Sequence, residues 1–273
     1  MRKIAFLLTS LIAAAPAIHA QEAPYQSSGD YGIDTKKVRF GAYVAPTMAW
    51  MRATSKSDDN KNYNIANDGS KVGFTYGLMA EYYFEDNYAI VTGLQMTNGG
   101  GKMSMQRVSS VAEANTIQKA SFQYNMAYME IPVGIKLRTD PVGNMRFFGQ
   151  VGLTLGINVA KKASYDLDYY DSDTKIQAIS KEKDKLTSSA TFSTAVAPAM
   201  LSMNIGIGAE IPFTNKVAGY VGLFFNNGFL PDATSPQNYE LYDNANNKIN
   251  VNSTFKDGNV RFNNFALRLG VFF

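Results

Sequence analysis

The stretch LSMNIGIGAEIPF (201–213) alternates between apolar and small or polar side chains along its whole length. Its odd positions, from Leu201 to Phe213, are all apolar, and its even positions are Ser, Asn, Gly, Gly, Glu and Pro. Successive side chains of an extended chain point to opposite faces. The pattern therefore predicts a β-strand with one apolar face and one polar face.

The same alternation recurs in eight extended stretches of the chain. It is clear in KVGFTYGLMAEYYF (71–84) and in MRFFGQVGLTLGINVA (145–160), where the second face collects Gly, Thr, Asn and charged residues. It is less regular in 38–50, 87–98 and 217–228, and no facing is predicted for those three stretches. The chain is therefore expected to be all-β.

The connections between these stretches alternate between short and long. An up-and-down barrel of the bacterial outer membrane has this asymmetry, with tight turns in the periplasm and long loops outside the cell. We therefore predict an eight-stranded antiparallel up-and-down transmembrane β-barrel with short periplasmic turns and long extracellular loops. The short connections are 85–87, 139–144 and 214–216, and the long ones are 51–70, 99–120, 161–197 and 229–259.

The two faces of the predicted strands suit a membrane barrel. Strand amides in the hydrocarbon layer can bond only to neighbouring strands, so the sheet must close with its apolar face toward lipid. Glycines on the inner face leave room in the lumen, admit bulky neighbours or permit the strands to bend, and the sequence does not distinguish these three interpretations. These glycines are Gly73, Gly77, Gly152, Gly156, Gly206 and Gly208.

Aromatic residues gather at the expected membrane boundaries, where barrels carry aromatic girdles. Trp50 is expected in the outer girdle, and a buried core position is the alternative. The residues expected in the periplasmic girdle are Tyr82, Tyr83, Phe84, Tyr88, Phe147, Phe213 and Tyr220.

The N-terminal stretch MRKIAFLLTSLIAAAPAIHA (1–20) has a basic start, an apolar centre and a small residue at its end. This is the plan of a secretory signal peptide, and the apolar centre is too short for a membrane-spanning helix. Residues 21–36 are expected to form a flexible periplasmic lead, and residues 37–273 the outer-membrane barrel. The chain has no Cys, which excludes disulfides and thiolate metal sites.

The C-terminus is an alternating strand with no polar tail. This last strand must pair with the first strand to close the cylinder. Its terminal aromatic resembles the signal by which outer-membrane assembly machinery recognises its clients. The residues expected to carry this signal are Phe265, Leu267, Leu269, Val271 and Phe273.

The stretch YMEIPVGIKLR (128–138) resembles the Tyr-Leu-Glu-Ile-Pro motif, followed by aliphatic residues and a Lys, of PorT-like outer-membrane barrels of Bacteroidetes. The stretch GQVGLTLGINVAKKAS (149–164) is similar to the fifth strand of the same family, and the layout is similar over nearly the whole mature chain. The resemblance implies an OmpA/OmpX-like eight-stranded barrel. It also implies an association with the secretion of surface proteins.

The fourth stretch changes the parity of its apolar side chains near 128–129. Residues 122–128 are apolar at even positions, whereas residues 129–137 are apolar at odd positions. A slip of one residue moves every side chain to the other face, so we predict a β-bulge near 128–129.

Several charged residues are expected to point into the lumen near the periplasmic end. An eight-stranded barrel has room inside for side chains only, and buried charges must be paired. We therefore expect a salt-bridge network that plugs the barrel, with a gated proton or ion path as the rival interpretation. The predicted members are Glu81, Lys136, Arg146, Glu210 and Arg268, with Glu130 somewhat higher.

The composition argues against an enzyme and against a nucleic-acid binder. The one His is His19, which leaves with the signal peptide, so catalysis that depends on Ser-His or His-metal chemistry is closed. The formal charge is +3, and removal of Arg2 and Lys3 with the signal leaves +1, too little to attract nucleic acid by bulk charge. No cofactor or metal site is expected.

Three functions remain open at this point. The first is a plugged structural or interaction barrel whose partners are a secretion system or a cell-surface protein, besides membrane lipids and the assembly machinery. The second is a narrow passive pore for small solutes. The third is a soluble, lipocalin-like barrel with its apolar face inward.

Overall fold

The computed structural model describes residues 37–53, 63–108, 116–171, 174–179, 184–185, 198–214, 216–230 and 260–273. The expected signal peptide (1–20) and periplasmic lead (21–36) lie outside these residues. Within the described ranges, ten β-strands form one sheet. They are β1 (Val38–Ala53), β2 (Tyr63–Glu85), β3 (Tyr88–Arg107), β4 (Thr116–Arg138), β5 (Arg146–Asp171), β6 (Thr174–Ile179), β7 (Asp184–Lys185), β8 (Ala199–Thr214), β9 (Val217–Gly228) and β10 (Val260–Phe272).

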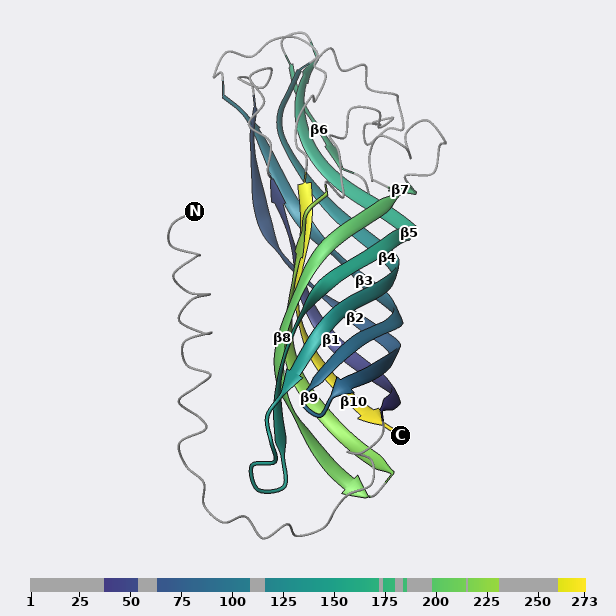
Figure 1. Ribbon diagram of the computed structural model, residues 1–273. Helices are drawn as coiled ribbons and strands as arrows, with labels where there is room; N and C mark the ends of the chain where they lie inside the picture. Colours follow the sequence, from purple (N-terminus) through teal and green to yellow (C-terminus); the bar gives the residue numbers. More distant parts are fainter. Residues whose placement is uncertain are drawn as a thin grey trace.

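Eight of these strands close into an antiparallel barrel (Figure 1). Their order is β4-β3-β2-β1-β10-β9-β8-β5, and the pairing of β4 with β5 completes the ring. The short strands β6 and β7 pair with β5 near one end of the cylinder. The predicted eight-stranded up-and-down barrel is confirmed. No helix within the described ranges is long and apolar enough to cross a membrane.

The apolar face of the sheet points outward. In β8 the odd positions such as Ile205 and Ile207 are exposed, whereas the even positions Asn204 and Glu210 are buried. The three stretches without a predicted facing also alternate, with Arg39 of β1 among the buried side chains. A lipocalin-like barrel would have the opposite arrangement, and that alternative is therefore wrong.

Trp50 lies on the outer face of the barrel and is half-buried there. Its ring stacks on Phe225 at 6.1 Å between centroids and contacts Phe265 at 5.4 Å. The alternative of a core tryptophan is wrong. Two residues expected in the periplasmic girdle, Tyr83 and Tyr220, are instead buried inside the barrel, because their strands present them to the lumen.

Strands β2, β3, β4 and β5 continue well beyond the other barrel strands (Figure 1). The backbone register extends to Tyr63↔Arg107 between β2 and β3, and to Thr116↔Tyr170 between β4 and β5. Parts of three predicted long loops are therefore strands. Their residues lack the apolar alternation because that pattern reflects a lipid-facing wall, whereas backbone pairing alone can extend a sheet.

The predicted bulge in β4 is corrected by the structure. Against β3, the register runs through Ala127 and Tyr128 without a shift. The irregularity lies between β4 and β5, where the pairing passes from Ala160 to Asn158 and leaves Val159 as the extra residue. The alternation of β4 never changes parity. Its apolar residues nearer the long loops, such as Tyr128, point into the lumen, and those nearer the short turns, such as Ile135, face outward.

Candidate functional site

Four charged residues from four strands form a ring of ion pairs inside the barrel near the short turns. Nη2 of Arg39 lies 2.6 Å from Oε2 of Glu81 and 2.8 Å from Oε1 of Glu210. Nζ of Lys136 lies 2.6 Å from Oε1 of Glu81 and also pairs with Oε1 of Glu210. Each cation therefore contacts both carboxylates, and each carboxylate contacts both cations.

The barrel architecture explains why these residues meet. Arg39 and Glu81 are directly opposite each other in the β1–β2 register. Lys136 and Glu210 come from β4 and β8, so their side chains reach the pair across the lumen. All four side chains are at most 3% exposed. An isolated charge in that setting would be costly, and the alternation of signs offsets the cost.

Tyr83 and Arg138 extend the ring toward the short turns. The hydroxyl of Tyr83 accepts a hydrogen bond from Arg39 at 2.7 Å and donates one to Glu81 at 2.9 Å. Nη1 of Arg138 lies 4.0 Å from Oε2 of Glu210, and its Nε donates to the Asp86 carbonyl at 2.9 Å. The guanidinium of Arg138 also lies over the Tyr83 ring, 4.1 Å from its centroid.

Phe272, the penultimate residue, covers the ring of ion pairs from inside the barrel. Its side chain has no solvent exposure, and its ring centroid lies 4.3 Å from Cζ of Arg39 and 4.9 Å from Nζ of Lys136. Gly41 makes room for it, since a Cβ at that position would lie 2.9 Å from Cδ1 of Phe272. The final strand thus contributes to the lumen as well as to closure of the sheet.

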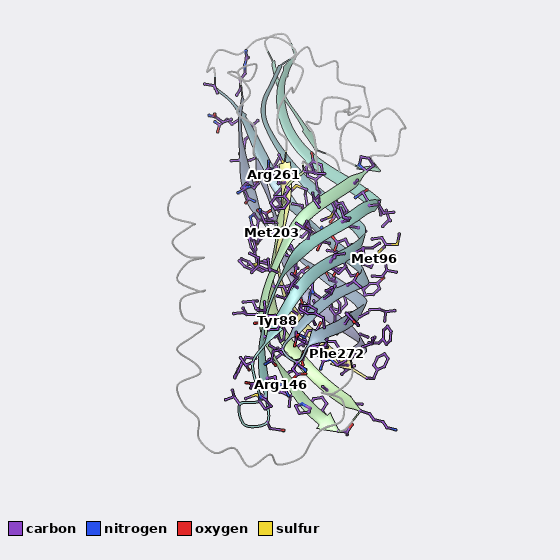
Figure 2. All side chains as sticks on the ribbon, viewed as in Figure 1. Tyr88, Met96, Arg146, Met203, Arg261 and Phe272 are labelled. Atoms are coloured by element: carbon purple, nitrogen blue, oxygen red, sulfur yellow. The ribbon has the colours of Figure 1, made fainter. Side chains whose placement is uncertain are left out.

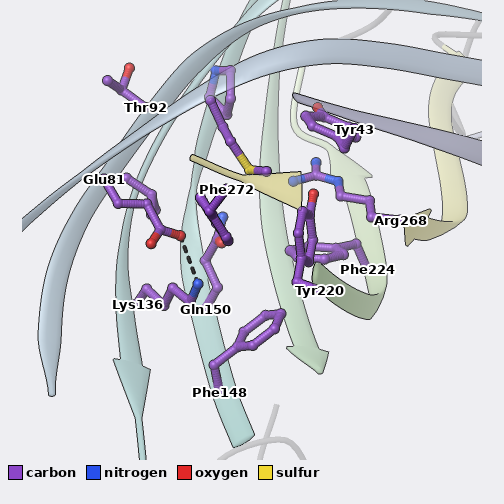
Figure 3. Close-up of a pocket in the computed structure, with 13 residues that line it drawn as sticks. Tyr43, Glu81, Thr92, Lys136, Phe148, Gln150, Tyr220, Phe224, Arg268 and Phe272 are labelled. Carbon is purple, nitrogen blue, oxygen red and sulfur yellow. Dashed lines mark hydrogen bonds and ion pairs between the residues drawn. The ribbon is translucent and has the colours of Figure 1, made fainter. Parts of the chain in front are cut away.

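A second polar layer lies above the ring and centres on Glu130. Its carboxylate accepts hydrogen bonds from Gln95 and from Oγ1 of Thr97, the latter at 2.7 Å. The Tyr43 hydroxyl donates a hydrogen bond to Oε1 of Gln95, and Nη2 of Arg268 donates one to the same oxygen at 3.4 Å. Figure 3 shows Arg268 beside Tyr43 and Phe224, and its guanidinium lies 4.0 Å from the Phe224 centroid.

The lumen changes character toward the long loops. A row of asparagines crosses three strands, with Asn204 donating to Asn226 at 2.5 Å and Asn226 donating to Asn264 at 2.7 Å. Beyond this row the large buried side chains are aromatic or thioether, although the polar Ser202 is also buried there. The large side chains are Met51, Met103, Tyr124, Met126, Tyr128 and Phe262.

The described structure brings together most of the residues predicted for the lumen. Glu81, Lys136 and Glu210 lie in the ring, and Glu130 and Arg268 lie in the layer above it. Arg146 is half-buried beside a short turn, where its guanidinium donates to the Thr139 carbonyl at 3.3 Å. It therefore sits at the mouth of the barrel rather than within the ring.

Arg39 is central to the ring, and the sequence did not predict it. The alternation that places Arg39 on the inner face is present in VRFGAYVAPTMAW (38–50). The odd positions of this stretch are Arg, Gly, Tyr, Ala, Thr and Ala, while most of its even positions are larger and apolar. Alanines on both faces weakened the contrast, so no facing was predicted. Phe272 was also missed, because an aromatic residue in a polar lumen contradicts the simple rule of a polar interior.

A small cavity of about 20 Å³ lies between the ring of ion pairs and the second layer, and Figure 3 shows it in close-up. Its lining combines charged groups, among them Glu81, Lys136 and Arg268, with the rings of Phe148, Phe224 and Phe272. Among the residues that the structure describes, no group of three or more His, Cys, Asp or Glu side chains is arranged to hold a metal ion. The site is thus an internal electrostatic network.

Side chains cover both surfaces of the wall along its length (Figure 2). On the outside, Leu78, Leu155 and Ile207 are all more than half exposed. Such a continuous apolar band is costly in water and stable in lipid. The outer surface therefore complements the filled interior.

Solved structures of outer-membrane barrels are similar to this chain. The Neisserial surface protein A is 14% identical with a TM-score of 0.40, and 87% of this chain and 96% of that chain are covered. Ail of Yersinia pestis is 11% identical with a TM-score of 0.34, covering 87% and 100%. OprG of Pseudomonas aeruginosa is 8% identical with a TM-score of 0.33, covering 86% and 94%.

No curated protein sequence matches the chain. The sequence model of one family, described as the outer membrane protein beta-barrel domain, matches residues 19–231, which is well over half of the 273 residues. That match agrees with the closed barrel and with its apolar outer wall. The chain therefore belongs to the outer membrane protein beta-barrel domain family and is a protein of the bacterial outer membrane.

Proposed function

We propose that this protein is a non-enzymatic barrel whose lumen is plugged and whose long-loop end engages a partner. The observation that carries the proposal is the filled lumen: the ion-pair ring, the Glu130 layer, the asparagine row and the aromatic residues follow one another along its length. Such an interior stabilises the barrel. Contacts with other molecules are then made at the two ends of the barrel. The partner is a cell-surface protein or a component of a secretion system, as the likeness to PorT-like barrels suggests.

The inward glycines support the plug over a narrow pore. A Cβ on Gly206 would collide with the ring of Phe224, and a Cβ on Gly156 would lie 2.8 Å from Cγ of Met200. These glycines therefore admit bulky neighbours instead of leaving an open path. The narrow passive pore is the alternative function, and this packing disfavours it.

The unequal strand lengths support an interaction role at the long-loop end. Strands β2 to β5 carry the sheet beyond the rest of the barrel, and exposed residues such as Asn64 and Gln106 lie on this projecting part. A sheet outside the hydrocarbon layer contributes nothing to spanning the membrane. It does offer a rigid surface, and rigid elements support more specific recognition than isolated loops.

The proposal excludes catalysis for a chemical reason. The described residues contain no His, and the carboxylates of Glu81, Glu130 and Glu210 all accept hydrogen bonds from buried neighbours. A general acid or base must be able to reach a substrate. These groups are more than nine-tenths buried, so they are unsuited to that task.

The outward residues of β10 support contact with lipid and recognition during assembly. Phe265, Leu267, Leu269 and Val271 are all exposed on the outer face, and Phe273 follows them with the same orientation. We propose that this row is read by the outer-membrane assembly machinery. The Phe273→Ala variant is then expected to reach the membrane in lower yield, while its assembled fraction is as stable as the wild type.

Conductance in planar lipid bilayers tests the plug. The wild-type barrel is expected to show no ohmic steps above leak, whereas a known open porin in the same bilayer shows them. Regular steps in proportion to the amount of reconstituted protein would support the pore instead.

Photocrosslinking in native outer membranes tests the interaction role. A crosslinking residue at Asn64 or Gln106 probes the projecting sheet, and one at Asn144 in a short turn is the matched control at the opposite end. Adducts with one protein from positions 64 and 106 are the expected outcome. Adducts from position 144 alone would move the partner to the short-turn side, and adducts from none of these positions would contradict an interaction role.

A further inference from the structure

Two arginines lie directly opposite each other on the outer face of the barrel, where the first and last strands pair. Arg52 of β1 is in register with Arg261 of β10, and Figure 2 shows Arg261 at the end of β10 nearest the long loops. The adjacent residues Met51 and Phe262 are buried in the lumen, so the alternation of the strands turns both arginines outward. Directly opposite side chains have Cβ atoms about 5 Å apart, and like charges there destabilise a sheet. An anion shared by the two guanidinium groups would replace this repulsion by attraction.

The two arginines have no carboxylate partner among the described residues. The ion pairs of that part of the chain include neither of them. Nε of Arg261 is buried there without a hydrogen-bond partner, whereas Arg52 is exposed. Asp68 of the neighbouring strand β2 accepts a hydrogen bond from Oγ of Ser121 at 3.2 Å instead. A buried donor without an acceptor costs stability, so the pair favours an anionic ligand.

The arginine pair lies just beyond the expected outer boundary of the hydrocarbon layer. Trp50 precedes Arg52 by two residues on the same face, and its ring packs against Phe225 and Phe265. Aromatic side chains gather at the level of the lipid head groups. On the membrane side of this aromatic cluster, the outward side chains of β1 and β10 are apolar and exposed. They include Val44, Met48, Leu267 and Leu269.

We propose that Arg52 and Arg261 bind the phosphate monoester of a lipid head group in the outer leaflet. A phosphate monoester carries up to two negative charges, which match the two arginines, and its oxygens accept paired hydrogen bonds from guanidinium groups. It supplies the acceptor that Nε of Arg261 lacks. The acyl chains of the same lipid lie along the apolar wall on the membrane side. The site is independent of any protein partner at the long-loop end.

Native mass spectrometry of the detergent-solubilised barrel tests the site. The probe is lipid A with its phosphate monoesters, compared with the same lipid A after enzymatic removal of the phosphates. We expect the wild type to bind one phosphorylated molecule about tenfold more tightly than the dephosphorylated one. Equal affinities would overturn the proposal. Displacement of lipid A by an equal concentration of inorganic phosphate would also overturn it, because the acyl chains would then contribute nothing.

Matched variants locate the phosphate. Arg52→Gln and Arg261→Gln each remove one positive charge, and each is expected to weaken the binding of phosphorylated lipid A by about tenfold. Lys216→Gln removes one charge from an exposed short turn at the opposite end and should keep the wild-type affinity. The gel shift between folded and unfolded forms verifies that all three variants are folded. If the arginine variants also keep the wild-type affinity, the phosphate binds elsewhere and the assignment fails.

Reversal of one charge gives a readout that loss of folding cannot imitate. In Arg52→Glu, the new carboxylate lies opposite Arg261 and forms a cross-strand ion pair with it. The unfolding midpoint in lipid-free detergent is therefore expected to rise by about 1–3 °C, while the preference for phosphorylated lipid A is lost. A higher midpoint with unchanged lipid binding would contradict the site. A lower midpoint would show that the two side chains do not face each other, which contradicts it as well.

Discussion

The two halves of the lumen are filled by different chemistry within one continuous wall. The short-turn half contains the ion-pair ring and the Glu130 layer, in which charged groups pair with opposite charges or with polar side chains. The long-loop half contains methionine and aromatic side chains, such as Phe262 packed 5.9 Å from Tyr128. The asparagine row centred on Asn226 separates the two.

This difference shows two solutions to the same packing problem. The lumen must be filled by closely packed side chains in both halves, because an empty space inside a protein means lost dispersion contacts. Charged contents also demand a specific partner for every group, whereas apolar contents demand only volume. The short-turn half should therefore tolerate substitution less well than the long-loop half.

Loss of one carboxylate from the ring is expected to have the largest effect. In Glu210→Gln, Arg39 and Lys136 share Glu81 as their remaining close anion, which leaves buried positive charge uncompensated. We expect the free energy of unfolding to fall by about 3–5 kcal/mol. Urea unfolding in lipid vesicles, followed by the gel shift between folded and unfolded forms, measures it.

The exposed Glu85 at the end of β2 provides the control for this experiment. Glu85→Gln should change the free energy of unfolding by no more than about 0.5 kcal/mol. Raising the salt concentration to about 1 M should leave the difference between the two variants unchanged, because buried pairs are screened little. Equal stabilities of the two variants would mean that the ring contributes nothing.

An intermediate effect is expected at the boundary between the halves. Asn226→Ala removes the middle of the asparagine row and leaves buried amide groups of Asn204 and Asn264 without their partner. The expected loss is about 2 kcal/mol, the usual cost of an unsatisfied buried polar group. Asn64→Ala on the exposed part of β2 is the control, and the same urea titration distinguishes them.

The smallest effect is expected in the long-loop half. Phe262→Leu keeps an apolar side chain in an apolar layer, where neighbours can adjust, so the expected loss is about 1 kcal/mol. Phe265→Leu makes the same change on the lipid-facing side of β10 and should cost less than that. A loss from Phe262→Leu as large as that from Glu210→Gln would show that the two halves are equally specific.

Much of the outer wall could be predicted from the sequence. Strong alternation in 71–84 and 201–213 gave both the strands and their facing, because lipid imposes the same apolar requirement on every outward side chain. The projecting parts of β2 to β5 could not be predicted in this way. Water on both faces imposes no such requirement, and their strand character depends on pairing with neighbouring strands.

The filling of the lumen was only partly predictable. Inward charges such as Glu81 and Lys136 were recognisable from their parity, but the two layers into which the charges divide depend on the register between strands. The parity change near Tyr128 was read as a bulge because the lumen was assumed to be polar throughout. The interior of the long-loop half is largely apolar. Strand β4 therefore points apolar side chains inward in that half and polar ones inward near the short turns, with no change of parity.

The amino-acid sequence by itself determined the number of barrel strands and the apolar outer wall. Each of these follows from a local sequence pattern, because lipid requires every outward-facing side chain to be apolar. Only the tertiary structure decided that Arg39 and Lys136 share Glu81 and Glu210, and that Phe272 covers them. Those contacts join strands far apart in the chain, and their geometry exists only once closure has set the stagger of every strand against its neighbours.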